Sequence, residues 1–224
     1  MPGTPRKADL EAAHDLVRTL FPGTPQYMWP LLAERTGCET WVKHENHTPI
    51  GAFKVRGGLV YIEDHARRHG SARGVITATR GNHGQSIATA CARLGVKATV
   101  VVPEGNSREK NAAMRAQGAE LVVHGHDFQE SVEYARERAE EDGLLMLPSF
   151  HDLLVRGVGT YAMELFTAQP DLDTVYVPIG LGSGICGVMA ARDAVGSKAE
   201  VIGVVAANAP AYALSFEAGK PVST

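Results

Sequence analysis

The chain has 224 residues, 44% of them hydrophobic and 21% charged, which is enough to bury a substantial core in one large domain or two small ones. Its 22 lysines and arginines stand against 25 aspartates and glutamates, and the formal net charge of -3 excludes the basic surface of a nucleic-acid-binding protein. No apolar run approaches the roughly 20 residues of a membrane span, and the first residues lack the apolar core of a signal peptide, so we expect a cytoplasmic protein.

Apolar residues at helical spacing predict three helices in the first third of the chain, at 9–21, 29–37 and 52–68, with a strand at 39–45 before the third. From Gly74 onward, short β-branched runs alternate with amphipathic helices, which is typical of βαβ units and a parallel sheet. Strands are expected at 75–78, 98–102, 121–123, 144–147, 174–177 and 201–205. Helices are expected at 82–94, 108–117, 128–141, 153–168 and 185–195. Ser107 is expected to cap the second of these five helices, and Asp127 with Glu130 to form a capping box on the third. The sequence therefore predicts an α/β protein.

The segment A-F-K-V-R-G-G at 52–58 places a single lysine, Lys54, among apolar residues and turn formers. Partial burial of the Lys54 stem would disfavour the ammonium form, so the amine becomes available as a nucleophile or Schiff-base former. Most lysines, however, are solvated surface residues. Two loops further along the chain favour the chemical interpretation.

One of these loops is the glycine-rich run G-L-G-S-G at 180–184, which follows an expected strand and precedes a helix. Unpaired amides and the positive dipole at such a helix start suit a phosphate. A Rossmann turn or an ordinary tight turn is the alternative, but no acidic residue ends the next strand to bind a ribose hydroxyl, and the Walker lysine is absent. The loop therefore fits a lone phosphate.

The other loop, Thr79 to His83, also joins a strand to a helix start, and its free amides suit a carboxylate. Asn82 can donate a hydrogen bond to an oxyanion such as a phenolate, or it can simply cap the helix. His83 could be a general base, although we favour a structural role because no Asp or Ser pairs with it in a known pattern. No G-x-S-x-G elbow supports a Ser-His-Asp hydrolase.

The motifs A-F-K-V-R-G-G, T-R-G-N-H-G-Q and G-L-G-S-G resemble, in order and separation, those of the pyridoxal-phosphate-dependent threonine and serine dehydratases, a family that includes serine racemase. The resemblance covers nearly the whole chain. It implies the fold type II architecture, similar to the β subunit of tryptophan synthase: α/β, with two open, mostly parallel sheets flanked by helices and the cofactor in the cleft between two domains. The large domain is expected at 1–66 and 154–224, incomplete at its C-terminus, and the small domain at 67–153.

The resemblance also implies a role for each motif. Lys54 forms a Schiff base with pyridoxal 5'-phosphate, Phe53 packs beside it, and Asn82 binds the 3-hydroxyl of the pyridine ring. The cofactor phosphate is held by the loop Gly180, Leu181, Gly182, Ser183 and Gly184. The substrate carboxylate is held by amides of the loop Thr79, Arg80, Gly81, Asn82 and His83. The cofactor supplies the electron sink that no side chain can provide.

Three departures from the family pattern set limits on these expectations. The family's chains continue beyond residue 224, and the partner of their pyridine nitrogen comes from that later part, so we expect a C-terminally truncated chain. The segment 206–211 offers no carboxylate for the divalent cation that some relatives bind, so no metal is expected. Arg80 stands where the family usually has a small residue, which acts as the second base in serine racemase, so racemisation is not expected.

The activity implied is that of an ammonia-lyase: β-elimination from L-threonine or L-serine to a 2-oxo acid and ammonia, by an enzyme that is a homodimer when full length. Arg80 suggests an alternative, because its guanidinium could bind the second carboxylate of an acidic substrate such as 3-hydroxyaspartate. An outward-facing Arg80 that pairs with a surface carboxylate is the simpler interpretation of that residue. Two further classes of protein stay open: a nicotinamide-binding domain, which gives Lys54 no role, and a non-catalytic α/β binding domain.

Overall fold

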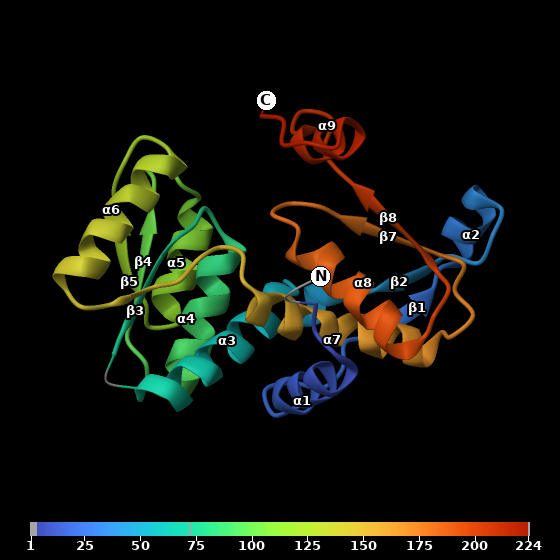
Figure 1. Cartoon of the computed structure of the whole chain (residues 1–224), viewed down its shortest axis with the longest axis horizontal. Coiled ribbons are helices and arrows are strands. Elements are labelled where there is room, and N and C mark those ends of the chain that lie inside the picture. Colours follow the sequence, from blue (N-terminus) through green and yellow to red (C-terminus); the bar gives the residue numbers. More distant parts are fainter. Residues whose placement is uncertain (1–3, 72, 224) are drawn as a thin grey trace.

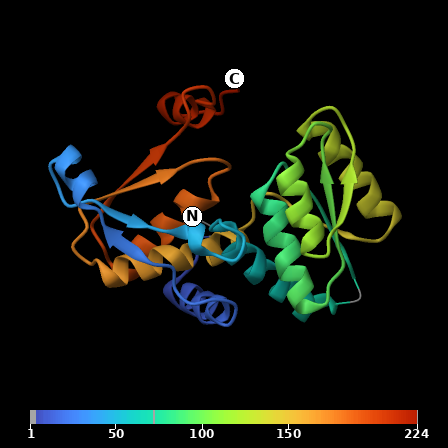
Figure 2. The same cartoon turned by 180° about the vertical axis from the view of Figure 1, so that it is seen from behind.

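The structure, a computed structural model, describes residues 4–71 and 73–223. Its elements form two lobes, which are connected through two long helices, α3 (Lys54–His69) and α7 (Asp152–Ala168) (Figure 1). The middle of the chain builds one lobe and the segments on either side of it build the other, as the view from behind also shows (Figure 2). Residues that are far apart in the sequence therefore meet where α3 and α7 lie.

The lobe built by the middle of the chain contains a parallel four-stranded sheet in the order β5-β4-β3-β6. Its strands are β3 (Val75–Ala78), β4 (Ala98–Val102), β5 (Glu120–Val123) and β6 (Leu145–Met146). Its helices are α4 (Asn82–Leu94), α5 (Arg108–Ala116) and α6 (Phe128–Glu141). Val75 of β3 packs in one hydrophobic cluster with α4, whereas its neighbour Ile76 packs in another with α6. Because successive strand residues point to opposite faces, helices cover both sides of this sheet.

The other lobe contains two short sheets. β7 (Thr174–Pro178) and β8 (Glu200–Val204) pair in parallel, and β1 (Gln26–Met28) and β2 (Trp41–Lys43) pair antiparallel. The remaining elements of this lobe are α1 (Lys7–Arg18), α2 (Pro30–Thr36), the 3-10 helix η1 (Glu45–His47), α8 (Ser183–Val195) and α9 (Ala211–Ala218). Leu10, Phe166 and Val188 belong to one buried cluster, which joins α1, α7 and α8.

The predicted α/β class and the two parallel sheets are confirmed, and the expected elements lie within a few residues of their predicted bounds. Strand β1 was not predicted, because its three residues do not alternate between buried and exposed. Helix α9 was not predicted either, because it has no buried face that would give it a periodic pattern. The capping box was half wrong: Asp127 accepts from the Glu130 amide at 2.9 Å, but the Glu130 carboxylate accepts from the His126 amide instead.

Helices α3 and α7 approach each other closely because glycines face the contact. A Cβ atom on Gly157 of α7 would collide with the carbonyl group of Arg56, and one on Gly57 of α3 would lie 2.8 Å from the Leu154 carbonyl oxygen. Helix α4 contacts the other side of α3, where the Ser86 hydroxyl donates a hydrogen bond of 2.6 Å to the Lys54 carbonyl oxygen. The first turn of α3 is therefore held from two sides.

Candidate active site

Lys54 opens helix α3, and its side chain is half-buried. Its Nζ atom lies 5.4 Å from the centroid of the Phe53 ring. Burial lowers the pKa of Lys54, and no carboxylate among the described residues opposes this effect. The amine therefore loses its proton more readily than that of a solvated lysine, which is what a nucleophile or a proton acceptor requires.

The glycine loop lies next to the ring of Phe53: a Cβ atom on Gly184 would be 3.6 Å from Phe53 Cζ. Gly182 is the N-cap of α8 and has a φ of 95°, a left-handed conformation that favours glycine. At Gly180 a Cβ atom would meet nothing within 4 Å, so this end of the loop faces open space. The loop thus combines the free amides of a helix start with room for a ligand.

Asn82 is the first residue of α4, and the N-cap of that helix is Gly81, which has no side chain to accept a hydrogen bond from a helix amide. Asn82 therefore does not cap the helix, and that interpretation is wrong. The neighbouring His83 is buried, and its Nε2 atom has no partner among the described residues. Burial, and then the charge of Lys54, lower the pKa of His83 to about 3. His83 is therefore a neutral ring near Lys54 and too weak a base for general-base catalysis at neutral pH.

The amides of the loop at 79–83 differ in their availability. The Thr79 amide donates to the Val101 carbonyl oxygen at 3.0 Å, and the Gly81 amide donates to Thr79 Oγ1 at 3.0 Å. Among the described residues, no partner accepts from the amides of Arg80, Asn82 or His83. A carboxylate in this loop would therefore find three free donors, the amides of Arg80, Asn82 and His83, rather than all five.

Lys110 of α5 is a candidate site residue that sequence reasoning missed. A Cβ atom on Gly81 would lie 2.9 Å from Lys110 Nζ, so this ammonium group faces the N-terminus of α4. The positive end of a helix repels a cation, and neither Lys110 nor the exposed Arg80 has an ion-pair partner in the described part of the chain. The unopposed positive charge suits an anionic ligand. One feature could have indicated Lys110: α5 follows β4, and the carboxyl end of β4 lies beside that of β3, where ligands bind in such sheets.

Two aromatic residues next to the glycine loop were also missed. The Tyr212 hydroxyl of α9 donates to the Leu181 carbonyl oxygen at 3.0 Å. A Cβ atom on Gly182 would lie 3.8 Å from that hydroxyl and 3.9 Å from a ring carbon of Phe150. Phe150 precedes α7, and Tyr212 belongs to an unpredicted helix, so nothing in the local sequence connected either residue to this loop.

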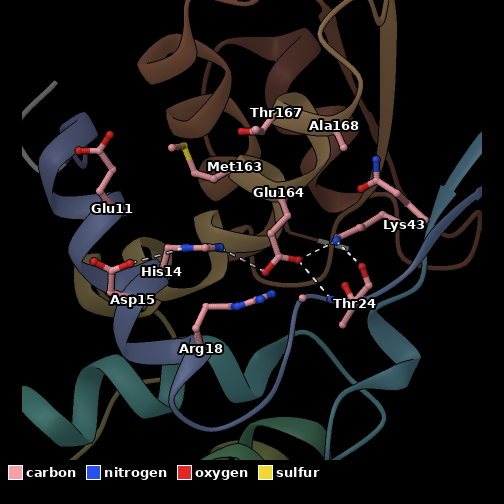
Figure 3. A pocket seen from close by; sticks show the side chains of 12 residues that line it. Glu11, His14, Asp15, Arg18, Thr24, Lys43, Met163, Glu164, Thr167 and Ala168 are labelled. Atoms are coloured by element: carbon pink, nitrogen blue, oxygen red, sulfur yellow. Dashed lines mark hydrogen bonds and ion pairs between the residues drawn. The ribbon is translucent and has the colours of Figure 1, made fainter.

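One cavity in the described structure does not include Lys54 among its lining residues. It measures about 530 Å³ and is bounded by α1, α7, β1 and β2, with His14, Arg18, Lys43 and Glu164 among its lining residues (Figure 3).

Within residues 4–71 and 73–223, no three His, Cys, Asp or Glu side chains are arranged to hold a metal ion. None of the helices in these ranges has the length and apolar character needed to cross a membrane.

Comparison with known proteins places the chain in a family. Residues 17–224 match the family model described as pyridoxal-phosphate dependent enzyme. The chain belongs to this family. An L-threonine ammonia-lyase from Geobacter sulfurreducens is 38% identical over 191 residues, which are 85% of this chain and 47% of the relative. A biosynthetic L-threonine dehydratase from Salmonella typhimurium is 36% identical over 200 residues, 89% of this chain and 39% of the relative. The chain thus spans less than half the length of these curated relatives.

Solved structures agree on the fold. The processed form of threonine deaminase isoform 2 from Solanum lycopersicum superposes with a TM-score of 0.89 at 31% identity, covering 96% of this chain and 59% of that one. The resemblance to threonine and serine dehydratases and the fold type II architecture predicted from the sequence are confirmed.

The residues of this chain fit the cofactor of its family, pyridoxal phosphate. Among the described residues, the amine of Lys54 has no carboxylate partner and the buried Nε2 atom of His83 has no hydrogen-bond partner, and the glycine loop has free helix-start amides and open space. Each is a group that a bound anionic, aromatic ligand would satisfy.

Proposed function

We propose that this chain carries the site of an ammonia-lyase that eliminates the β-hydroxyl group of L-threonine or L-serine and yields a 2-oxo acid and ammonia. The observation that supports this most directly is the position of Lys54. Its half-buried amine opens α3, next to the starts of α4 and α8, through the contacts of Ser86 with Lys54 and of Phe53 with Gly184. Relatives and structural neighbours named as threonine ammonia-lyase and threonine deaminase favour the same chemistry.

Pyridoxal phosphate would be held by residues from both lobes. Lys54 would bond to it covalently, Phe53 would pack beside it, Asn82 would bind its 3-hydroxyl, and residues 180–184 would hold its phosphate at the N-terminus of α8. When bound, the cofactor supplies the electron sink that makes the α-proton of an amino acid acidic enough to remove.

The chain's own residues would then orient the amino acid and move its proton. The amides of Asn82 and His83 would hold the α-carboxylate at the positive end of α4, with Lys110 adding charge from α5. Lys54 Nζ would accept the α-proton, a task that its lowered pKa favours because the neutral amine is the proton acceptor. His83, being neutral, would not compete for that proton.

The test is substitution of Lys54. In Lys54→Ala we expect no cofactor fixed by borohydride, no visible absorbance band from a covalently bound cofactor and no 2-oxobutanoate from threonine, with the far-UV circular dichroism of the wild type. Lys97→Ala, at an exposed lysine outside the site, is the matched control and should fix cofactor normally. Borohydride fixation that persists in Lys54→Ala would show that another lysine is used, and joint loss of fixation and fold would make Lys54 structural.

A second candidate substrate class is an acidic β-hydroxy amino acid such as 3-hydroxyaspartate. Arg80 and Lys110 favour it, because both lack a carboxylate partner, among the described residues, at the loop proposed to bind substrate. A solved pyridoxal 5'-phosphate-dependent aspartate racemase also has this fold, with a TM-score of 0.92 at 29% identity, covering 98% of this chain and 68% of that one.

The two substrate classes are separated by comparing threonine, serine and 3-hydroxyaspartate on the wild type, Arg80→Ala and Lys110→Ala. A charge-assisted hydrogen bond contributes about 1.5 to 3 kcal/mol, so kcat/KM for the acidic substrate should fall roughly tenfold or more while threonine is affected less. An equal loss for all three substrates would assign these cations to the α-carboxylate. No loss at all would leave threonine or serine as the substrate.

We also infer that the protein acts in the cytoplasm and that it is a homodimer when full length. Sedimentation velocity at several protein concentrations measures the assembly state, and cell fractionation measures the location.

A further inference from the structure

Arg56 follows Lys54 by two positions, and its side chain is completely buried. Helix residues advance by about 100° each, so a residue two positions along projects from the opposite side of the helix. The same turn of α3 thus directs the Lys54 amine to the proposed site and the Arg56 guanidinium into the protein behind it. Whatever fixes Arg56 also fixes the turn that presents Lys54.

Two carboxylates and two hydroxyl groups bind the guanidinium. Glu45 accepts from Nε at 2.8 Å and from Nη2 at 2.9 Å, which is the forked geometry that an arginine offers a carboxylate. Glu164 accepts from Nη1 at 2.9 Å and from Nη2 at 3.1 Å. The hydroxyls of Thr160 and Thr24 accept at 3.1 and 3.3 Å. All three guanidinium nitrogens are therefore occupied.

Glu164 of α7 is the point where this network meets the rest of the lobe. Its Oε2 atom also accepts from Lys43 Nζ at 2.6 Å and from the Thr24 amide at 3.3 Å, and His14 lies 3.7 Å from its other oxygen. Figure 3 shows the Glu164 carboxylate between His14 on one side and Lys43 with Thr24 on the other. Burial raises the pKa of Glu164, but hydrogen bonds from Arg56 and Lys43 outweigh it and lower the pKa, so this carboxylate stays ionised.

The network also spans the segment that carries Lys54. Glu45 lies in η1, before the loop that leads into α3, and Arg56 lies just after Lys54. The ion pair between them therefore closes residues 46–55 into a loop with Lys54 near one end. Glu164 connects this loop to α7, a helix whose buried residues belong to the hydrophobic cluster that also includes α1 and α8.

We propose that Glu164 is a positioning residue of the active site: by binding Arg56, it fixes the first turn of α3 so that the Lys54 amine points at its ligand. This proposal rests on the function proposed above, in which Lys54 bonds to pyridoxal phosphate. Glu164 touches no reacting atom. We expect Glu164 to increase the rate at which Lys54 reacts with pyridoxal phosphate and also to stabilise the fold.

The test measures how fast pyridoxal phosphate becomes fixed to Lys54 by borohydride in the protein stripped of cofactor, with the modified peptide identified by mass spectrometry. Glu164→Gln keeps the shape of the side chain but places an amide against two cations, and we expect fixation to slow at least tenfold at a temperature well below unfolding. Glu164→Asp, which restores the charge, should recover part of that rate.

Two controls separate positioning from loss of stability or of surface charge. Phe166→Leu weakens the buried core of α7 without touching the network, and it should lower the unfolding temperature while leaving the fixation rate unchanged. Asp15→Asn removes an exposed carboxylate from the cavity that Glu164 also lines, and it should leave the fixation rate unchanged as well. Equal slowing in Phe166→Leu and Glu164→Gln would overturn the proposal, because general destabilisation would then explain it.

The remaining outcomes are also decisive. Wild-type fixation in Glu164→Gln would refute the positioning role and leave the proposed function intact, whereas no fixation of Lys54 in the wild type would refute the proposed function itself. Should Glu164→Gln fail to fold, Glu164→Asp provides the test, because it keeps the charge but shortens the side chain that reaches Arg56. Fixation about threefold slower than in the wild type supports the proposal, and an unchanged rate refutes it.

Discussion

At the scale of single residues, Lys54, Arg56 and His83 show how burial acts differently on groups with and without partners. Lys54 has no carboxylate nearby among the described residues, so burial lowers its pKa. Burial would lower the pKa of Arg56 as well, but hydrogen bonds to Glu164 and Glu45 raise it, and the guanidinium stays charged. Burial, and then the charge of Lys54, lower the pKa of His83, so its ring stays neutral. The protein thus has, near the start of α3, an amine with a lowered pKa, a fixed cation and a neutral ring.

The neutral state of His83 predicts a loss of stability in acid. In the unfolded chain this histidine binds a proton below its ordinary pKa of 6.5, whereas in the folded protein it does so only below about 3. The unfolded state therefore binds the extra proton between these values, and the free energy of unfolding falls by about 1.4 kcal/mol per pH unit as pH decreases through this window.

His83→Gln should remove this contribution. The free energy of unfolding, measured with urea from pH 6.5 to pH 4, should therefore fall less steeply with decreasing pH in the variant than in the wild type. Because other titrating groups are common to both proteins, the difference between the two slopes isolates His83. Parallel slopes would mean that the folded protein protonates His83 as readily as the unfolded chain does.

At the scale of elements, the crossing of α3 and α7 determines where Lys54 and Glu164 can lie. Glycine is otherwise unfavourable within a helix, by about 1 kcal/mol relative to alanine, so its presence at this contact needs a compensating gain. The gain is the short approach between Gly157 and Arg56, which brings Thr160 and Glu164 of α7 within hydrogen-bonding reach of the guanidinium.

Gly157→Ala should therefore destabilise the protein, although the same change at an unhindered helical position stabilises. Overpacking against the backbone of α3 costs about 1 to 3 kcal/mol, which exceeds the gain in helix propensity. The matched control is Gly184→Ala in α8, where a Cβ atom meets its nearest neighbour at 3.6 Å. Urea unfolding should show a lower midpoint for Gly157→Ala than for Gly184→Ala, and equal midpoints would contradict the tight crossing.

At the scale of the whole molecule, the proposed site draws on both lobes. Asn82 and Lys110 come from the lobe of the four-stranded parallel sheet, the glycine loop comes from the other lobe, and Lys54 stands at the start of a helix that contacts both. We propose that these lobes correspond to a large domain at 1–66 and 154–224 and a small domain at 67–153.

Such a shared site predicts that pyridoxal phosphate stabilises both lobes together. A ligand that binds only the folded state adds about 2.7 kcal/mol at one hundred times its Kd, so calorimetry should show one transition that moves to higher temperature with cofactor concentration. Lys54→Ala, which lacks the covalent bond, should show a smaller shift. Two separate transitions, of which the cofactor moves only one, would show that a single lobe holds the ligand.

Much of this protein follows from its sequence because the responsible forces act over a few residues. The alternation of strands and helices after residue 74 depends on local periodicity, and Ser107 caps α5 because the group it binds is the nearby Lys110 amide. The three motifs indicated the family for the same reason: each is a short run with its own chemistry, and their order along the chain is visible without a fold.

Only the tertiary structure decided which distant groups meet. Arg56 and Glu164 are 108 residues apart, and nothing near either one predicts their ion pair. Lys110 faces Gly81 only because β3 and β4 are adjacent in the sheet. The protonation states of Lys54 and His83 depend on how much water and charge the folded chain leaves around them. Long-range ion pairs and burial arise when remote segments pack together, so they have no signature in the local sequence.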